Sequence, residues 1–530
     1  MTETTDPLDT ARNRRWTAIV AASAATVMTL DITVVNIALP RIGSDLHSGL
    51  DGLQWVVNAY TLTFAALLLI AGALSDRFGR RRIFTLGTVV FTVASAACMS
   101  AWSTELLIVG RAVQGIGGAM MMATALALIA GAYSGAEPGR RERAVAMFAA
   151  AGALAATAGP IVGGLIIDSM NWRVMFAVNI PLGAFILYGA LRRVDDDRPG
   201  GGTIDGIGSV LAVLTLFAMN CALVEGPHKG WRQSDVDLAL GGSAVLAVAF
   251  VVVMVRLGDR AMLPLRLLRI PSFSGAILLS FVARMVSFGM FPFLIIWLSA
   301  SLRFSPIRVG LVLSVLAVAL MVGAPIGMGL AKRMPIARVL AIGMLLTGIG
   351  MLTAVPIGPD AHWTALLPML LSTGLGSGLV LPHLLDLAIA VVPPAEAGTA
   401  SGAVNSFLPL GTSLSIAVYG AVFTAKVDSA MPGQALQRTG VPAEITAQVR
   451  DLATAGQLEA AARLAPGAAA PIHSLATSGY THALSVIFLI SGVGAVLSAF
   501  ASLVLVRPED KLAAVPQSAR HPEPVRRQEL

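Results

Sequence analysis

Apolar stretches of about twenty residues recur along the whole chain, separated by short segments rich in charge, proline or glycine. A bilayer core needs about 20 apolar residues per helix, so each stretch predicts a membrane-spanning helix. The chain is therefore predicted to be an all-α membrane protein with many spans. Fourteen spans are expected, at residues 16–38, 52–75, 83–101, 104–132, 143–167, 172–191, 203–225, 238–257, 272–300, 306–331, 337–356, 363–389, 398–424 and 480–506.

Composition agrees with this pattern. Of the 530 residues, 56% are hydrophobic and only 13% are charged, and the mean hydropathy is +0.77. Cys98 and Cys221 both lie in apolar runs, so we expect buried thiols, with no disulfide framework and no metal cluster. Residues 1–15 are polar and no cleavable signal is evident, so the first span is expected to remain in the mature protein.

The basic residues indicate how the spans are oriented. With the N-terminus inside, 25 of the 37 Lys and Arg residues fall in inner segments, 10 in outer segments and two within helices. Positive charge collects on the cytoplasmic side, so both termini are expected in the cytoplasm of a cell with the protein in its inner membrane. Basic residues beside spans report topology, and no nucleic-acid partner is expected.

A long outer connection, residues 425–479, precedes the last span. Its segment PAEITAQVRDLATAGQLEAAARLA has helical periodicity and is predicted to lie as one amphipathic helix at the outer surface. A solvated lid and a functional gate are equally compatible with this pattern. The C-terminal tail, residues 507–530, is polar and is expected to be disordered.

Motifs of enzymes are missing from the chain. There is no Walker A sequence and no nucleophile elbow, and no His or Cys spacing suggests a metal. GLGSGL near residue 374 resembles a phosphate loop only superficially, because glycines inside an apolar helix permit close helix packing. No catalytic residue, metal or cofactor is therefore expected.

Residues 72–87, GALSDRFGRRRIFTLG, form the first inner loop. Gly72 is predicted to allow close helix approach, and Asp76, at a helix end, to pair with an arginine or to cap a neighbouring helix. Arg77 and Arg80, followed by Arg81 and Arg82, are predicted to anchor the inner face. The spacing of these residues with Gly79 is more specific than an ordinary basic loop.

Further segments have the same specificity: LDITVVNIALP (30–40), RAVQGIGGA (111–119), GPIVGG (159–164) and NWRVMFAVNIPLG (171–183). With the inner loop, they resemble the signature motifs of the major facilitator superfamily, in its fourteen-helix drug–proton antiporter branch. The resemblance implies two six-helix bundles, residues 16–191 and 272–506, with an inserted hairpin at 203–257. It also implies a cavity between the bundles that opens alternately to each side.

Asp31 and Arg111 are the two charges that stand out in the first bundle. A buried arginine stays protonated and needs partners, and Asp31, Gln114 and backbone carbonyls are candidates. Gly115 and its neighbours are expected to let this helix pack tightly. The resemblance implies that Arg111 takes part in proton coupling, whereas a static ion pair is the alternative. Asp31 is expected to carry the coupling proton, to contact a cationic substrate, or to neutralise Arg111.

The fifth span contains a run of small residues around a proline. Gly159, Gly163 and Gly164 permit close helix contact, and Pro160 allows a bend. In the family that the chain resembles, this helix packs against the other half and seals one side of the cavity. The order of these residues favours export over import.

The second half departs from the first. Lys332 stands where the first loop has its acid, and Leu408 and Pro409 replace a polar step of the thirteenth helix. Arg284, and the pair His383 and Asp386, are candidate cavity residues, because charges inside spans are expensive in lipid. His383 and Asp386 could share a proton at i and i+3. A structural ion pair is the alternative for Arg284 and Asp386.

The function expected from these motifs is proton-driven export of amphipathic, often cationic, compounds, with Asp31 or Asp386 carrying the proton. Export of one native metabolite, antibiotic or lipid is the rival, and a proton-coupled importer is less favoured. A membrane enzyme or sensor is the alternative from another class, and no catalytic constellation supports it. The expected partners are protons, small amphipathic substrates and the bilayer, and the protein is expected to be a monomer.

Overall fold

The structure, a computed structural model, describes residues 7–133, 140–195, 205–258, 261, 265–393 and 396–510. The regular elements of these residues are all helical. Thirteen helices in this part of the chain are long and apolar enough to cross a membrane. The remaining expected span corresponds to α2 (Leu50–Phe78), which is 29 residues long and packs among them. The predicted all-α membrane fold is confirmed.

The first half consists of six long helices: α1 (Pro7–Leu46), α2, α3 (Arg80–Met99), α4 (Thr104–Ala132), α5 (Arg140–Ser169) and α6 (Arg173–Arg193). The second half contains α9 (Pro271–Phe288), α10 (Phe291–Ile296), a π-helical turn η3 (Trp297–Ser301), α11 (Pro306–Ala331), α12 (Ile336–Thr353), α13 (Leu367–Ala390), α14 (Ala397–Ala430) and α18 (Ala469–Leu505). Short 3-10 turns η2 (Leu267–Arg269), η4 (Trp363–Leu366) and η8 (Pro508–Asp510) flank these helices.

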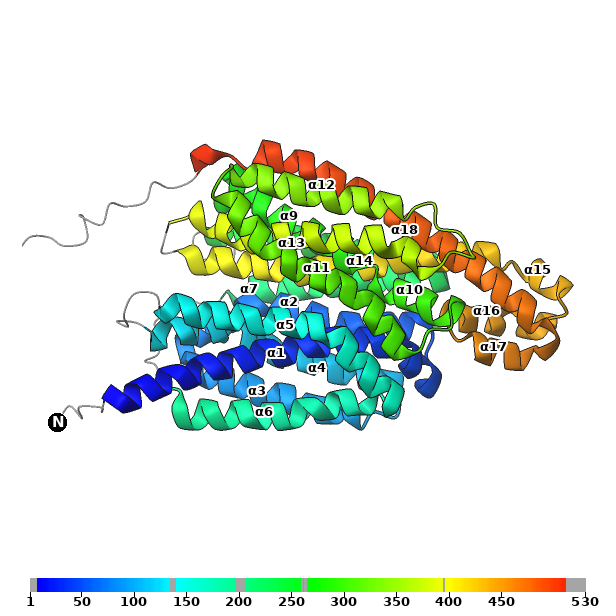
Figure 1. Cartoon of the computed structure of the whole chain (residues 1–530), viewed down its shortest axis with the longest axis horizontal. Helices are drawn as coiled ribbons and strands as arrows, with labels where there is room; N and C mark the ends of the chain where they lie inside the picture. Colours follow the sequence, from blue (N-terminus) through cyan, green and yellow to red (C-terminus); the bar gives the residue numbers. More distant parts are fainter. Residues whose placement is uncertain are drawn as a thin grey trace, which may run out of the picture.

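The two halves repeat the same helix pairings. In the first half α4 packs against α2 and α3, and α1 packs against α5. In the second half α13 packs against α11 and α12, and α9 packs against α14. Figure 1 shows the first half below and the second half above, with their long helices nearly parallel. This repeat is the internal duplication that the resemblance of the sequence motifs implies.

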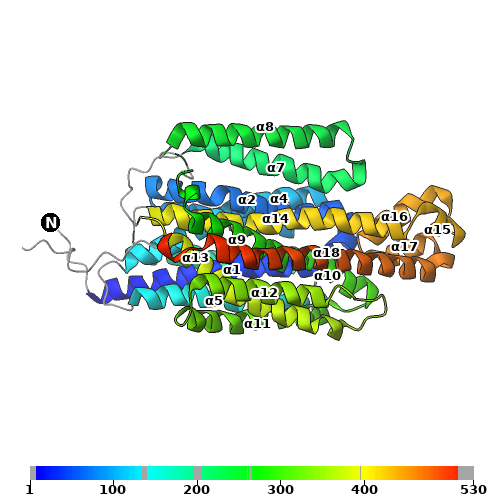
Figure 2. The same ribbon diagram turned by 90° about the horizontal axis from the view of Figure 1, so that it is seen from above.

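A helical hairpin lies outside both halves. It consists of α7 (Gly206–Lys229) and α8 (Ser234–Leu257), and α7 packs on α2 and α14. Figure 2 shows the hairpin along one edge of the molecule, with α8 outermost. Many of the exposed side chains of α8 are large and apolar, as expected for a helix that faces lipid.

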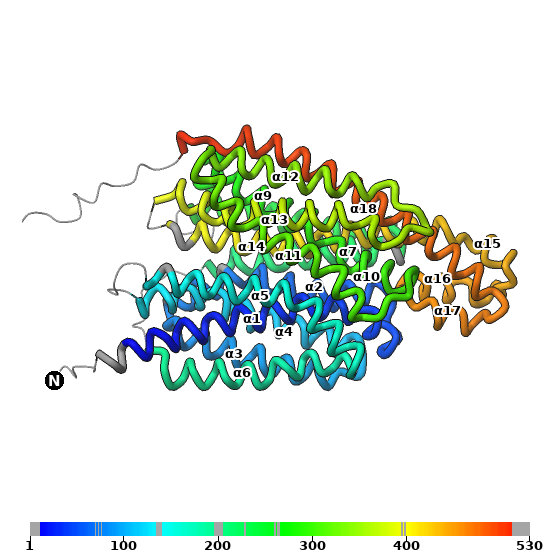
Figure 3. The backbone as a smooth tube through the Cα atoms, in the orientation of Figure 1, coloured from blue at the N-terminus to red at the C-terminus, as the bar shows by residue number. Residues whose placement is uncertain are grey.

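The hydrophobic cores differ between the two ends of the molecule. We call the end where α1 begins and α18 finishes the terminal end, and the opposite end the capped end (Figure 3). At the capped end one cluster of buried side chains joins both halves, from Leu39 and Leu53 to Phe293, Val309 and Phe423. Towards the terminal end each half has a separate cluster. The halves are therefore sealed together at the capped end in this conformation.

Three short helices cover the capped end: α15 (Gly433–Arg438), α16 (Thr446–Thr454) and α17 (Leu458–Leu464), with turns η6 (Ala443–Ile445) and η7 (Pro466–Ala468). The prediction of one amphipathic helix here is wrong, because Gly456 takes a left-handed φ of 79° and ends α16. Val449 and Ala461 of these helices are buried in the protein core. The apolar face is therefore covered by the protein itself.

The ends of several helices also lie beyond their predicted positions. α18 starts at Ala469 where the pattern predicted 480, and α1 runs to Leu46 where it predicted 38. Both extensions lead into the capped end, so the long outer connection is shorter than residues 425–479. Hydropathy marks the apolar part of a helix and misses turns that continue outside it.

Candidate functional site

A network of buried polar side chains lies inside the first half. Arg111 of α4 forms an ion pair with Asp31 of α1 through Nη1 and Oδ2. Asp31 is 5% exposed and Arg111 is 1% exposed, so neither charge is solvated. Such a pair is stabilised only when further hydrogen bonds satisfy the remaining polar atoms. The structure therefore brings together the two charges that the sequence singled out.

Three further side chains complete the hydrogen bonding of this pair. Gln114 accepts from Arg111 Nη1 at 2.6 Å and donates to Asp31 Oδ1 at 2.9 Å. Asn179 of α6 donates to the same Oδ1, also at 2.9 Å. Ser95 Oγ accepts from Gln114 at 2.8 Å and from Asn179 at 3.3 Å. Both carboxylate oxygens of Asp31 thus accept hydrogen bonds, from donors on two other helices.

The guanidinium of Arg111 has two additional neighbours. Its Nε donates to the carbonyl oxygen of Val56 at 3.2 Å. The ring of Tyr60 lies 4.3 Å from the guanidinium carbon, within the range of a cation–π contact. The guanidinium of Arg111 is therefore surrounded by an acid, an amide, a carbonyl and an aromatic face.

Sequence reasoning did not identify Asn179, Ser95 and Tyr60 as site residues. Asn179 lies within the quoted segment NWRVMFAVNIPLG, and an amide in the middle of an apolar helix was an available signal. Ser95 and Tyr60 had no comparable signal, because their position depends on how α3 and α2 pack against α4.

The network can respond to a proton. Protonation of Asp31 would remove the only carboxylate that pairs with Arg111 among the described residues, and arginine cannot release its own proton. The site would then hold an uncompensated buried charge, which is strongly unfavourable. A proton on Asp31 is thus able to favour a conformation in which Arg111 is solvated or paired differently.

Close helix contacts surround this site at the predicted small residues. A Cβ on Gly115 would lie 2.5 Å from the carbonyl oxygen of Tyr60, so α4 crosses α2 at this point. On α5, Gly159 and Gly163 face Thr33 and Val34 of α1, whereas Gly164 faces Pro306 of α11 in the other half. Gly310 of α11 in turn faces the carbonyl oxygen of Pro160 at 2.0 Å from its Cβ position. The fifth helix therefore joins the halves at the capped end.

The inner loop is only partly as expected. Gly79 has a φ of 99° and separates α2 from α3, and Arg80 donates to the carbonyl oxygen of Ala127 at 3.2 Å. Arg77 is exposed and lies over the ring of Phe78. The side chain of Asp76 lies outside the described part of the chain. A Cβ on Gly72 would meet nothing within 4 Å, so the predicted close approach at Gly72 is wrong in this conformation.

The candidate residues of the second half do not form a comparable network. His383 is buried, and its Nε2 lies near Gly327 of α11 and has no hydrogen-bond partner among the described residues. Asp386 is exposed. In the described structure no hydrogen bond joins these two side chains, and proton sharing between them stays a prediction. Arg284 is partly buried, and its guanidinium carbon lies 4.1 Å from the ring centre of Phe288.

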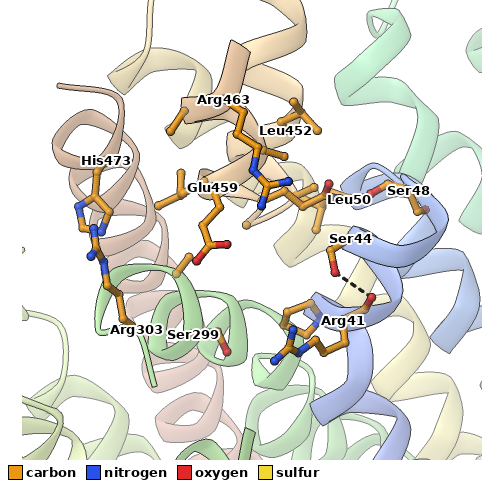
Figure 4. Close-up of a pocket in the computed structure, with 18 of the residues that line it drawn as sticks. Arg41, Ser44, Ser48, Leu50, Ser299, Arg303, Leu452, Glu459, Arg463 and His473 are labelled. Carbon is orange, nitrogen blue, oxygen red and sulfur yellow. Dashed lines mark hydrogen bonds between the residues drawn. The ribbon is translucent and has the colours of Figure 1, made fainter. Parts of the chain in front are cut away.

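A cavity of about 1630 Å³ lies at the capped end, between the end of α1, the start of α11 and the helices α16 and α17. Figure 4 shows Arg41, Arg303, Arg463 and Glu459 with their side chains around this space. Gln457, which is one of the residues that line the cavity, bridges the halves, because its Nε2 donates to the carbonyl oxygen of Ser48 at 2.7 Å. The cap is thus bonded to the connection between α1 and α2.

Comparison with known proteins identifies the family to which this architecture belongs. Residues 21–416 match the model of the Major Facilitator Superfamily. The "Probable actinorhodin transporter" of Streptomyces coelicolor is 34% identical over 83% of this chain and 79% of its own length. The "Tetracenomycin C resistance and export protein" of Streptomyces glaucescens is 30% identical over 95% of this chain and 94% of its own length.

Solved structures show the same fold at low sequence identity. A bacterial homologue of the human lysosomal transporter Spinster, in an inward-facing and occupied conformation, has a TM-score of 0.62 at 16% identity, and the match covers 95% of this chain and 99% of that chain. A peptide transporter, POT, in complex with sulfate has a TM-score of 0.60 at 15% identity, over 92% of this chain and 95% of that one. By fold and by sequence, the chain belongs to the major facilitator superfamily.

Proposed function

We propose that this protein is a proton-coupled antiporter that exports small amphipathic compounds across the cytoplasmic membrane. The observation that carries this proposal is the buried pair of Asp31 and Arg111, held by Gln114 and Asn179. A titratable carboxylate inside a membrane bundle is a candidate proton site. Relatives named as antibiotic transporters and resistance proteins support export.

The proposed cycle follows from the charge balance around Arg111. In the conformation sealed at the capped end, Asp31 is hydrogen-bonded and paired with Arg111. When the carrier is open to the outside, a proton that binds Asp31 leaves Arg111 unpaired, and the helices then rearrange to the conformation that is closed at the capped end and open to the inside. Release of that proton on the inner side restores the ion pair. Substrate binding and proton binding then favour opposite conformations, which is what exchange requires.

Both termini lie in the cytoplasm in this proposal, and the capped end faces outward. The excess of Lys and Arg in segments at the terminal end supports this orientation. Single cysteines at positions 12 and 460, introduced after replacement of Cys98 and Cys221, test it. A membrane-impermeant maleimide added to intact cells is expected to label position 460 only, and labelling of position 12 would reverse the orientation.

Transport in vesicles tests the coupling. The purified protein is reconstituted with an imposed proton gradient and offered a chemically varied panel of fluorescent compounds. We expect gradient-driven movement of several compounds, which an uncoupler abolishes, and loss of that movement in Asp31→Asn. Transport by Asp31→Asn at the original rate would exclude Asp31 as the coupling site.

A second carboxylate of the same helix provides a matched control. Asp45 also pairs with an arginine, Arg173, but the side chain of Asp45 is 44% exposed. Asp45→Asn is therefore expected to keep gradient-driven transport. If both variants lose transport equally, the effect reflects helix α1 as a whole and not the buried site.

Export of a single native product is a second candidate. Two of the relatives are each named for one antibiotic, actinorhodin and tetracenomycin C. This candidate predicts that the same vesicles move one chemical class in the panel and leave the others behind.

A further inference from the structure

Arg284 of α9 is a charged residue that the proposed coupling site does not use. Among the described residues no carboxylate lies within ion-pair distance of it, and its Nε is buried without a hydrogen-bond partner. Arginine does not deprotonate in proteins, so this side chain carries a full positive charge inside a membrane bundle. An unpaired charge in such a place is costly unless another group supplies the counter-charge.

Neighbouring helices account for the other faces of α9. Ser287 accepts a hydrogen bond from Ser377 of α13 at 2.8 Å, and Val286 lies against Gly494 of α18. The backbone of Phe281 and the Cβ position of Gly289 face α14. With 100° per residue, Arg284 points between the directions of α13 and α14, and away from α18. The outer face of α18 carries exposed apolar residues such as Leu497 and Phe500, so Arg284 points towards the interior of the molecule.

Two acids inside the spans, Asp31 and Asp386, could in principle neutralise Arg284, but the first already has other partners and the second faces away. Asp31 accepts hydrogen bonds from Arg111, Gln114 and Asn179 within the other half. Asp386 lies nine residues after Ser377 on α13, which is two and a half helical turns. Because Ser377 faces α9, Asp386 lies on the opposite side of α13 and is exposed.

The aromatic ring beside Arg284 completes the arrangement. Phe288 lies one turn along α9, with its ring centre 4.1 Å from the guanidinium carbon. The guanidinium is planar and presents paired donors, which match the two oxygens of a carboxylate or sulfonate. Phe288 offers an apolar face next to that charge.

We propose that Arg284 and Phe288 recognise substrate charge, and that the transported compounds include organic anions with an aromatic ring system. The anionic group pairs with the guanidinium of Arg284, and the ring packs against Phe288. This inference rests on the proposed export function, and it replaces the expected preference for cations. Among the described residues no carboxylate forms an ion pair with Arg284, so this position favours an anion over a cation.

Equilibrium binding to the purified protein in nanodiscs tests the inference with two probes of opposite charge. Fluorescein is the anionic aromatic probe and ethidium is the cationic one. Loss of one charge-assisted contact corresponds to about a tenfold change in affinity. Arg284→Gln is expected to weaken fluorescein binding about tenfold and to leave ethidium binding unchanged. Equal effects on both probes, or none on fluorescein, would overturn the inference.

Matched variants separate charge recognition from general damage. Arg308 is an exposed arginine near the start of α11, and Arg308→Gln removes the same charge elsewhere in the second half. It is expected to bind fluorescein as the unmodified protein does. Arg284→Lys keeps the charge but loses the paired donors, so it is expected to retain part of the affinity that Arg284→Gln loses. Phe288→Leu is also expected to weaken binding. If Arg284→Lys binds as poorly as Arg284→Gln, recognition by charge is rejected.

The unfolding temperature of the ligand-free protein distinguishes charge recognition from a structural role, because the two roles predict changes of opposite sign in Arg284→Gln. Removing an unpaired, partly buried charge relieves desolvation, so Arg284→Gln is expected to raise the unfolding temperature of the ligand-free protein and to reduce the further rise that fluorescein causes. A lower unfolding temperature would show that Arg284 holds the fold together.

An inorganic anion is the other source of counter-charge, and the buffer distinguishes it. Fluorescein binding is measured in gluconate and again with chloride at about 0.15 M, a physiological ionic strength. Unchanged affinity supports an organic anion, and displacement by chloride would overturn the assignment. Arg284-dependent fluorescein binding that survives while no compound is transported would reject the proposed function and would leave Arg284 as an anion-binding residue only. Gradient-driven transport of cations alone, with no Arg284-dependent binding of fluorescein, would reject this inference and keep the proposed function.

Discussion

The two halves share a fold but differ in whether the arginine inside each bundle has a carboxylate partner. Gly115 of α4 and Gly374 of α13 occupy matching crossings, since a Cβ on each would lie 2.5 Å and 2.3 Å from a carbonyl oxygen of the paired helix. Four residues before each glycine stand Arg111 in the first half and Leu370 in the second, and both are buried. The first half therefore satisfies its charge internally, whereas Arg284 in the second half has no such partner. In the proposed mechanism, the first half carries the proton chemistry and the second half recognises the substrate.

The largest expected effect comes from breaking the paired charge of the first half. Asp31→Ala leaves Arg111 buried without its acid, so the free energy of unfolding is expected to fall by about 3–5 kcal/mol. Denaturant titration in micelles measures this, with Arg284→Gln as the comparison in the second half. The comparison between halves fails if both substitutions destabilise the protein equally.

A smaller effect is expected where the halves meet. The Cβ of Gly310→Ala would lie 2.0 Å from the carbonyl oxygen of Pro160, so the capped end must loosen. Overpacking of this kind costs about 1–3 kcal/mol, which shifts a two-state equilibrium about 5- to 150-fold. Spin labels at positions 41 and 303 are expected to report a larger population of long distances.

The control for that experiment lies on the same helix. A Cβ on Gly329 meets nothing within 4 Å, so Gly329→Ala is expected to leave the distance distribution unchanged. Identical distributions for the two variants would indicate that the contact between α5 and α11 does not seal the capped end.

The cap is expected to contribute less. Gln457→Ala removes the hydrogen bond to the carbonyl oxygen of Ser48, which is worth about 1 kcal/mol, or about a fivefold shift toward opening. The same pair of spin labels measures the shift. Gln448→Ala, an exposed residue of α16, is the matched control. No difference between these variants would make the cap a passive cover and not a gate.

The smallest effect is expected for the exposed ion pair of the first half. Asp45 accepts from Arg173 and, at 2.9 Å, from Nε1 of Trp172. Exposed pairs contribute about 0–1 kcal/mol, so Asp45→Asn is expected to change the unfolding free energy by no more than that. A loss similar to that of Asp31→Ala would mean that burial does not determine the strength of these pairs.

The spans and the central ion pair could be predicted because they depend on local or compositional signals. Apolar length sets the number of spans, and a charge inside a span indicates a partner nearby, as for Asp31 and Arg111. The hydrogen bonds of Asn179 and Ser95 could not be predicted, because they depend on which helix faces meet. The side of α13 that carries Asp386 likewise becomes visible only once Ser377 is seen to face α9.

Other predictions failed because sequence patterns do not specify the conformation. Gly72 belongs to a motif, yet a Cβ on Gly72 would meet nothing within 4 Å in this conformation. The two halves have separate cores towards the terminal end. The segment of the outer connection is predicted to lie as one amphipathic helix at the outer surface, but the capped end of the bundle covers its apolar face. In both cases the pattern identifies a face that needs a partner without saying which partner it meets.

The unpaired Arg284 has an electrical consequence. Moving one elementary charge through a membrane potential of 100 mV corresponds to about 2.3 kcal/mol. An empty carrier that exposes this guanidinium to one side and then to the other moves part of a charge through the field. A carrier loaded with an organic anion moves almost none. The membrane potential would therefore act mainly on the return of the empty carrier, and the voltage dependence of turnover would report the charge of the cargo.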